Sequence, residues 1–325
     1  MSKNDNKSCK FTSIGGQALI EGIMMRGPEV SAMAVRNPQG EIVLEKWKTT
    51  TSNRAKILKL PIVRGMFNFI DSMKTGYKCL MRSAEIAMPE EEDPNKPKTE
   101  AEKKKESAAL GVAAGIGGVL GVVLAVVLFM WLPVQLYSLI TGAVPAMETR
   151  FLRSLFEGLF RIALFIGYVS LMCLMKDIRR TFQYHGAEHK TIFCYEAGLP
   201  LTVENIRAQK RFHPRCGTSF LILMLLVGII IGMFIHVTNP ILRTLIKLAL
   251  LPLTMGIGYE LIKLCGKHDN VLTRIIAAPG VWLQHITVHE PDDDMIECAI
   301  AAMNAVIPEN HPTADDTPAE DTKEE

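Results

Sequence analysis

Residues 108–132, AALGVAAGIGGVLGVVLAVVLFMWL, decide the architecture of this chain because they form a long run without a single charged residue. A helix rises about 1.5 Å per residue, so this run is longer than the roughly 30 Å hydrocarbon core of a bilayer. The sequence therefore predicts a transmembrane helix here. Glycines at small-residue spacing would let a second helix approach closely, which suggests self-association through this face; they are Gly111, Gly115, Gly117 and Gly121.

Three further apolar runs follow, at residues 155–175, 219–237 and 241–265. Pro252 interrupts the last of them, and we expect a kink there. Together the four runs predict a four-helix membrane domain within residues 108–265. The fold class expected is thus a mainly α membrane protein, with a small N-terminal cytosolic β-rich (α+β) domain before it.

The second predicted span contains charges, which are costly inside a bilayer unless they are paired. Arg153, Glu157 and Arg161 recur every four residues and so share one helix face. We expect them to pair with one another near the outer interface.

Basic residues flank the predicted spans unevenly. On one side they are Lys103, Lys104, Lys105, Lys176, Arg179, Arg180, Lys190, Arg207, Lys210, Arg211 and Arg215, whereas the other side has only Arg150, Arg153, Arg243 and Lys247. By the positive-inside rule, both termini and the segment 176–218, which we expect to be a loop, face the cytosol. The surrounding lipid bilayer is the first partner expected.

Residues 14–87 predict the cytosolic β-rich domain. Short apolar runs alternate with turn signals up to residue 48, which is typical of a small antiparallel sheet. Pro38–Gln39–Gly40 predicts the turn of a hairpin. From Ile62 to Ala87 apolar residues recur three and four apart, which predicts an amphipathic helix on the sheet or on the membrane surface.

The remaining segments are polar or amphipathic. We expect a disordered N-terminus (1–13), a charged linker (88–107), cytosolic or interfacial helices (266–307) and a disordered acidic tail (308–325).

The composition narrows the partners and the compartment. The net charge is only +2, and no basic stripe with interleaved aromatic residues occurs, so we expect no nucleic-acid partner. The seven cysteines are scattered and odd in number, which is unlike a secreted disulfide framework and indicates a reducing compartment.

The chemistry of the chain is concentrated between the second and third predicted spans. On a helix His185 and His189 lie one turn apart on one face, with Glu188 beside them. Zinc enzymes with an H-x-x-E-H helix use the two histidines as ligands and the glutamate as the base. A lone copy of this pattern would also describe a helix with two surface histidines.

A second motif strengthens the metal hypothesis. His213 and Cys216 add a nitrogen and a thiolate at chelating spacing on the same segment, a set that suits Zn²⁺ or, less well, iron. If His185, His189, His213 and Cys216 all bind, the site is closed and structural. If three of them bind, or two histidines and a distant glutamate, a position stays free for water and the site is catalytic.

Glu260 bears on this choice because it lies near the cytosolic end of the fourth predicted span. It is either a third ligand or an acceptor for a ligating histidine, or it is an ion-pair partner for Lys263 or a loop arginine.

Taken together, these motifs resemble those of the YqhQ family of bacterial multi-pass membrane proteins. The residues concerned are GGQALIEGIMMRGP (15–28), HGAEHK (185–190), LTVEN (201–205), HPRCGTS (213–219), GYE (258–260) and EPD (290–292). The resemblance covers nearly all of residues 14–307. It implies a location in the bacterial plasma membrane and metal-dependent chemistry, and it supplies no substrate.

Two functions from different classes follow. The first is a cytosol-facing membrane metalloprotein of hydrolase type, with Glu188 as general base. The alternative is a non-enzymatic membrane scaffold or adaptor that has a structural zinc site and binds a protein partner through its N-terminal sheet.

Overall fold

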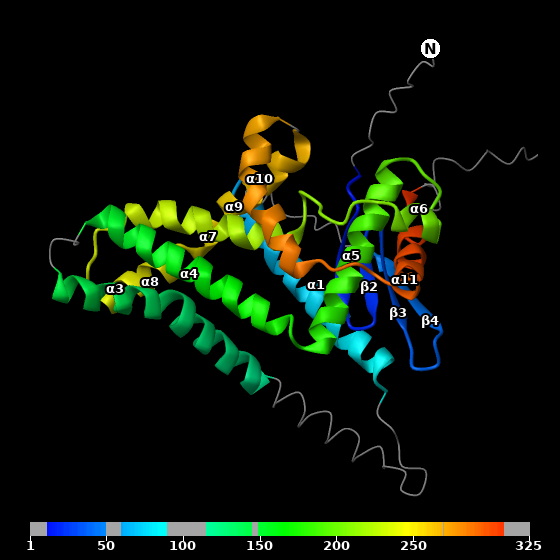
Figure 1. Cartoon of the computed structure of the whole chain (residues 1–325), viewed down its shortest axis with the longest axis horizontal. Coiled ribbons are helices and arrows are strands. Elements are labelled where there is room, and N and C mark those ends of the chain that lie inside the picture. The colour runs from blue at the N-terminus through cyan, green and yellow to red at the C-terminus, as the bar shows by residue number, and fades with distance from the viewer. Residues whose placement is uncertain (1–11, 50–59, 90–114, 145–148, 269, 309–325) are drawn as a thin grey trace, which may run out of the picture.

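The computed structural model describes residues 12–49, 60–89, 115–144, 149–268 and 270–308. A small sheet flanked by helices forms one part, and a group of long apolar helices extends from it (Figure 1). Most of the predicted disordered N-terminus, charged linker and acidic tail, and the first residues of the first predicted span, lie outside the described residues.

The N-terminal part is an antiparallel sheet, as predicted. Its strands are β1 (Gly15–Leu19), β2 (Gly22–Arg26), β3 (Val30–Arg36) and β4 (Ile42–Lys48), in the spatial order β1-β2-β3-β4. Arg36 pairs with Ile42 across the turn at Pro38–Gly40, which confirms the predicted hairpin.

Helices cover both faces of this sheet. Successive side chains of a strand point to opposite faces, so Met33 and Val35 pack toward the amphipathic helix α1 (Val63–Ala87). Ala32 and Ala34 pack instead against α5 (Lys176–Glu196) and α11 (Asp293–Asn304). The first and last parts of the described chain therefore share one apolar core.

Among the residues that the structure describes, two helices are long and apolar enough to cross a membrane. The first runs from Gly115 to Ala143 and includes a π-helical turn, η2 (Val127–Trp131), before α3 (Leu132–Ala143); the second is α4 (Arg150–Met172). A third candidate is α8 (Pro240–Ala249) with α9 (Leu251–Lys267), which are bent by 48° where the sequence predicts a kink at Pro252.

The prediction of four transmembrane helices is therefore too high, since only two or three of the described helices pass this test. The helix that fails is α7 (Gly217–Met233), whose 17 residues span only about 25 Å at 1.5 Å per residue. It packs against α4, α9 and α10 (Val271–Thr287). A helix that is apolar on all sides, like α7, is suited to such a buried position.

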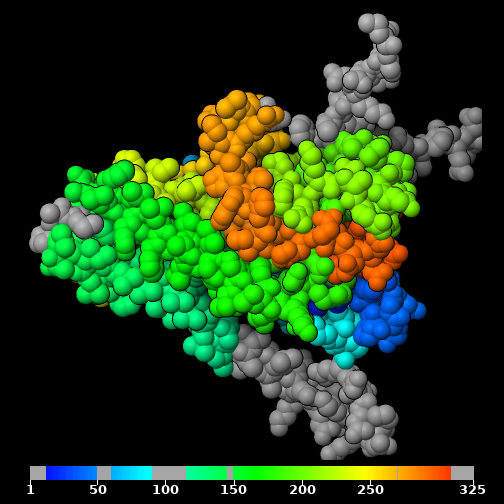
Figure 2. Space-filling view, in the orientation of Figure 1, coloured from blue at the N-terminus to red at the C-terminus, as the bar shows by residue number. Residues whose placement is uncertain are grey.

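The segment 176–218, expected to be a loop, is mainly helical. It contains α5 and the short α6 (Val203–Arg207) before α7 begins. Of the two C-terminal helices, α11 belongs to the core of the sheet, whereas the first half of α10 projects from the body of the molecule (Figure 2).

The charge of Glu157 on α4 is stabilised by two cations of α8. Glu157 is fully buried and forms ion pairs with Arg243, at 3.0 Å, and with Lys247. Arg243 also donates to the carbonyl oxygen of Ile235 at 2.8 Å. Glu157 is thus paired across the helix interface, where the sequence predicts pairing along its own helix.

Candidate metal centre

Helix α5 presents the first motif as predicted. His185, Glu188 and His189 lie one turn apart on the side of α5 that packs on the sheet and the C-terminal segment, and Glu188 and His189 are buried. The His185 and His189 rings meet edge to face with their centroids 4.4 Å apart.

Cys216 joins these histidines from another element. It is the N-cap residue of α7, where its Sγ accepts a hydrogen bond from the backbone N–H of Thr218 at 3.4 Å. One ligand atom from each of His185, His189 and Cys216 lies within 4.8 Å of the other two. One ion can bridge atoms about this far apart after small side-chain rotations, because Zn–N and Zn–S bonds are about 2.0–2.3 Å.

Backbone carbonyls set the tautomer of both histidines. The carbonyl oxygen of Thr287 accepts from Nδ1 of His185 at 3.0 Å, and that of Arg211 accepts from Nδ1 of His189 at 2.6 Å. A carbonyl can only accept, so each Nδ1 bears a proton and Nε2 is the nitrogen that each imidazole can offer to a metal. Metal-binding histidines are oriented in this way.

The two Nε2 atoms differ in what they contact. Nε2 of His185 lies 3.1 Å from Cys216 Sγ. Nε2 of His189 is buried and makes no hydrogen bond to any described residue. An orphaned buried nitrogen next to a thiol and a second imidazole nitrogen is the donor set that Zn²⁺ prefers, so these residues fit the predicted metal.

The electrostatics favour a thiolate at Cys216. Burial opposes its ionisation, but His185 and His189 hold the pKa of this thiol well below its usual range. Burial likewise opposes charge on His185, yet the neighbouring Cys216 and Glu188 raise the pKa of that imidazole to about 9. A thiolate is the form in which cysteine binds a metal.

Glu188 is buried beside the cluster and lines the same cavity as His189 and Cys216. Gly16 of β1 approaches so closely that a Cβ there would lie 2.8 Å from Cγ of Glu188, and its N–H bonds to the carboxylate. Burial raises the pKa of Glu188, although His185 and His189 act in the opposite direction. A carboxylate with a raised pKa is suited to proton transfer near neutral pH.

His213 is close to the cluster but is turned toward a different partner. Its ring centroid lies 5.6 Å from that of His189, and its Nδ1 accepts from the N–H of Arg215 at 3.2 Å. Its Nε2 faces the buried carboxylate of Glu196 at 3.9 Å. The structure thus brings His213 to the rim of the cluster and leaves it out of the group of three.

The structure places Glu260 away from the cluster. Its carboxylate accepts two hydrogen bonds from Arg64 of α1, one of them from Nε at 2.7 Å. Of the two roles considered for Glu260, the structure displays the ion pair, with an arginine that sequence reasoning did not consider.

Other residues of the site were not predicted from the sequence. The cavity at the cluster has a volume of about 510 Å³, and its wall includes Arg215, Lys263 and Lys267. Glu196, which belongs to neither sequence motif, is buried and bonded to Arg215. Only the double glycine at Gly15–Gly16 hinted that a backbone comes this close, and no local signal marks the carbonyls of Thr287 and Arg211.

Comparison with known proteins gives a family without a function. The family described as "Protein of unknown function (DUF1385)" matches residues 60–309. A relative from Bacillus subtilis (strain 168), named "Uncharacterized protein YqhQ", is 35% identical over 301 residues, which cover 90% of this chain and 92% of the relative. No solved structure matches the chain.

Proposed function

The chain belongs to the YqhQ family, a family of unknown function (DUF1385), and we propose that it is a membrane metalloprotein with a hydrolase-type zinc site. His185, His189 and Cys216 are the proposed ligands, and Glu188 is the proposed general base. The observation behind this proposal is the convergence of these three ligand atoms within 4.8 Å while carbonyls hold both Nδ1 protons away from the centre.

The number of ligands favours catalysis over a purely structural role. Structural zinc sites are closed by four protein ligands, whereas catalytic sites have three and keep one position for water or substrate. Among the described residues the group comprises three side chains, and Glu188 and a cavity lie beside them.

Zn²⁺ bound here would act as a Lewis acid and lower the pKa of a bound water molecule. The protein's part is to hold the ligands by their Nδ1 hydrogen bonds and to accept the proton at Glu188. Lys263 and Lys267 give the cavity wall a positive charge, whereas Arg215 is paired with Glu196. An anionic substrate, such as a phosphoester or a carboxylate, is therefore favoured.

His213 supports the alternative function, a scaffold or adaptor with a structural zinc site. Its ring lies next to that of His189 and would close the site if it turned away from Glu196. The N-terminal sheet would then be the surface for a protein partner.

Glu188→Gln separates the two functions. With a catalytic base, zinc content stays at the wild-type level while turnover of a test phosphoester such as p-nitrophenyl phosphate falls about 10²- to 10⁴-fold. The measurement is initial rate beside zinc content on the same detergent-purified sample. A zinc-loaded wild type that turns over this ester no faster than Glu188→Gln would favour the scaffold.

We also propose that the chain lies in the bacterial plasma membrane with both described ends in the cytosol. Strands β1–β4 and α11 share one core, so the chain must cross an even number of times between them. Two passes, by the helix Gly115–Ala143 and by α4, satisfy this condition. Gly115, Gly117 and Gly121 have open space around them, which is consistent with self-association in the bilayer.

Metal analysis tests the zinc site. Full-length protein purified in detergent should contain about one zinc per chain by this ligand set, and His189→Ala should lose most of it. His285→Ala is the matched control, because His285 is exposed on α10 and should leave the zinc content unchanged. Protein without stoichiometric metal, or equal metal in wild type and His189→Ala, would overturn the proposal.

A further inference from the structure

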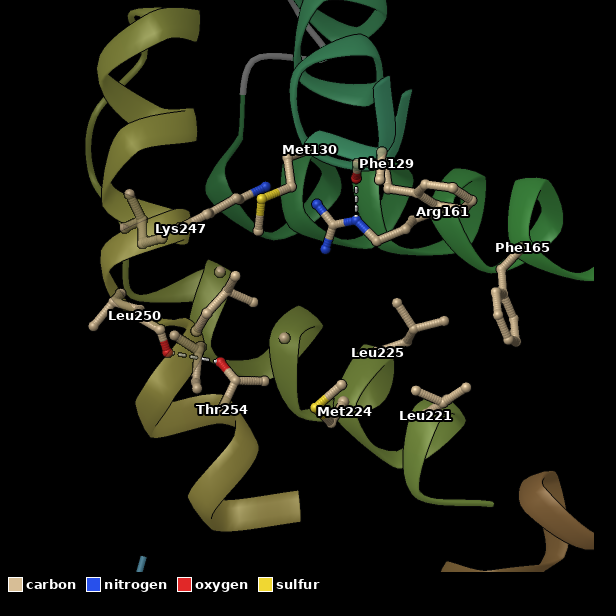
Figure 3. Close-up of a pocket in the computed structure, with 16 residues that line it drawn as sticks. Phe129, Met130, Arg161, Phe165, Leu221, Met224, Leu225, Lys247, Leu250 and Thr254 are labelled. Carbon is tan, nitrogen blue, oxygen red and sulfur yellow. Dashed lines mark hydrogen bonds between the residues drawn. The ribbon is translucent and has the colours of Figure 1, made fainter. Parts of the chain in front are cut away.

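A second cavity lies within the group of apolar helices. It shares no lining residue with the cavity at the metal centre. It has a volume of about 400 Å³ and is walled by η2, α4, α7, α8 and α9 (Figure 3). Its lining is almost wholly apolar and includes Phe129, Phe165, Leu221 and Leu225. This volume and lining are typical of a pocket for a small organic ligand.

Arg161 is a cation without a counterion in this cavity. Its side chain enters from α4, and the residue is only 8% exposed. Its Nε donates to the carbonyl oxygen of Phe129 at 2.5 Å, whereas its Nη2 is buried with no hydrogen-bond partner among the described residues. A buried guanidinium nitrogen without an acceptor is costly, so an acceptor is expected at this point.

The π-helical turn accounts for the contact of Arg161 with a backbone oxygen. Phe129 lies within η2, where the usual i to i+4 hydrogen bonds are interrupted. A π turn of this kind is often found at a functional site. The turn therefore holds the guanidinium at the cavity wall without supplying a negative charge.

Lys247 is the second cation at the same end of the cavity. It enters from α8, and Figure 3 shows it and Arg161 on opposite walls of that end. Its partner Glu157 also pairs with Arg243, so one carboxylate is shared by two cations and leaves Arg161 unbalanced. No carboxylate lines the described cavity.

We propose that this cavity binds an amphiphile with one acyl chain and an anionic head group. The head, a carboxylate or a phosphate, accepts hydrogen bonds from Arg161 and Lys247, and the chain lies along Phe165, Leu221 and Leu225. An apolar ligand would leave the Arg161 nitrogen unpaired, and a free anion would leave the apolar walls uncovered. An amphiphile satisfies both ends.

Gly228 offers a way to fill the cavity without changing its charge. It lines the cavity, and a Cβ there would have Nη1 of Arg161, at 3.8 Å, as its nearest neighbour. A leucine at this position fits at Cβ and extends into the space proposed for the acyl chain. Gly167 on α4 has open space around it and is exposed, so Gly167→Leu adds the same side chain outside the cavity.

The experiment is a fluorescence titration of the full-length protein, in a neutral detergent, with cis-parinaric acid. The acid should bind, and its methyl ester should bind at least about tenfold more weakly, because a charge-assisted hydrogen bond is lost. Arg161→Gln should weaken the acid to the same extent and leave the ester unchanged, and Gly228→Leu should abolish both. Gly167→Leu and Arg150→Gln are the controls expected to bind as the wild type does.

Three results would overturn the proposal. Equal binding of the ester and the acid to the wild type would show that the pocket is indifferent to charge. Equal binding by Gly228→Leu and Gly167→Leu would place the acyl chain elsewhere. Displacement of the acid by millimolar inorganic phosphate would show a site for a small anion; a lysophosphatidic acid that displaces it where phosphate fails supports the amphiphile.

Discussion

The two hydrogen bonds at Nδ1 of His185 and His189 support a metal site more strongly than the presence of the two histidines alone. An imidazole can present either nitrogen, and the carbonyl oxygens of Thr287 and Arg211 select Nε2 for both. These carbonyls come from two different segments, the end of α10 and the connection before α7. The site is therefore pre-organised by the packing of α5 against both.

Metal binding at this site should depend on pH with a definite sign. Cys216 and Glu188 raise the pKa of His185 to about 9, and the pKa of Cys216 is held well below its usual range, so near pH 7 the pair carries one proton, on His185. The metal must displace that proton. Zinc affinity should therefore rise about tenfold per pH unit between pH 6 and 8, with about one proton released per ion.

Calorimetric titration of zinc into the metal-free protein, in buffers of different ionisation enthalpy, measures that proton. Cys216→Ser is the informative variant, because it should lose affinity and show a weaker pH dependence. Affinity that stays constant between pH 6 and 8 would mean that the His185–Cys216 pair is not the ligand set.

Helices α4 and α8 are joined by a buried ion pair, to which α4 contributes Glu157 and α8 contributes Arg243. Removing one partner leaves the other charge buried and uncompensated, which costs about 3–5 kcal/mol. Glu157→Leu should therefore lower the thermal stability of the detergent-solubilised protein strongly, and Glu157→Leu with Arg243→Leu should recover part of the loss. Thermal unfolding followed by intrinsic fluorescence measures both. Equal stability of Glu157→Leu and the wild type would contradict this account of α4.

The elements themselves could largely be predicted, because each leaves a local pattern in the sequence. The strands, the hairpin at Pro38–Gly40, the amphipathic α1 and the kink at Pro252 all follow from side-chain periodicity and turn residues. The length of α7 could not, because the apolar run continues to Val237 while the helix ends at Met233. Where a helix ends inside an apolar run is set by packing, here by the carbonyls of Ile235 and Val237 that accept from Arg243.

The candidate site could also be predicted only where its residues form a local pattern in the sequence. His185, Glu188, His189 and Cys216 were predicted from spacing; the structure brings the last three to one cavity and places His185 against Cys216. The partners of Glu260 and His213 were not, because Arg64 lies 196 residues from Glu260 in the chain and Glu196 belongs to neither motif. Pairings between distant segments leave no mark in a single sequence.

At the scale of the whole molecule, the shared core of the sheet and α11 constrains the path through the bilayer. In the proposed topology Lys46 on β4 and Asp294 on α11 lie on the cytosolic side, and Arg150 at the start of α4 lies on the other. In intact cells a membrane-impermeant maleimide should label Arg150→Cys and spare Lys46→Cys and Asp294→Cys, which react only after permeabilisation. Opposite labelling of Lys46→Cys and Asp294→Cys would require an odd number of crossings and contradict the proposed topology.

X-ray absorption at the zinc K-edge of the purified, zinc-loaded protein is the most direct measurement of the proposed ligand set. We expect one sulfur ligand at about 2.3 Å, two imidazole nitrogens at about 2.0–2.1 Å and one further light atom that is not imidazole. His213→Ala should leave this spectrum unchanged, since His213 faces Glu196. A spectrum with three imidazoles and one sulfur that loses an imidazole in His213→Ala would show a closed site, and a spectrum without sulfur would remove Cys216 from it.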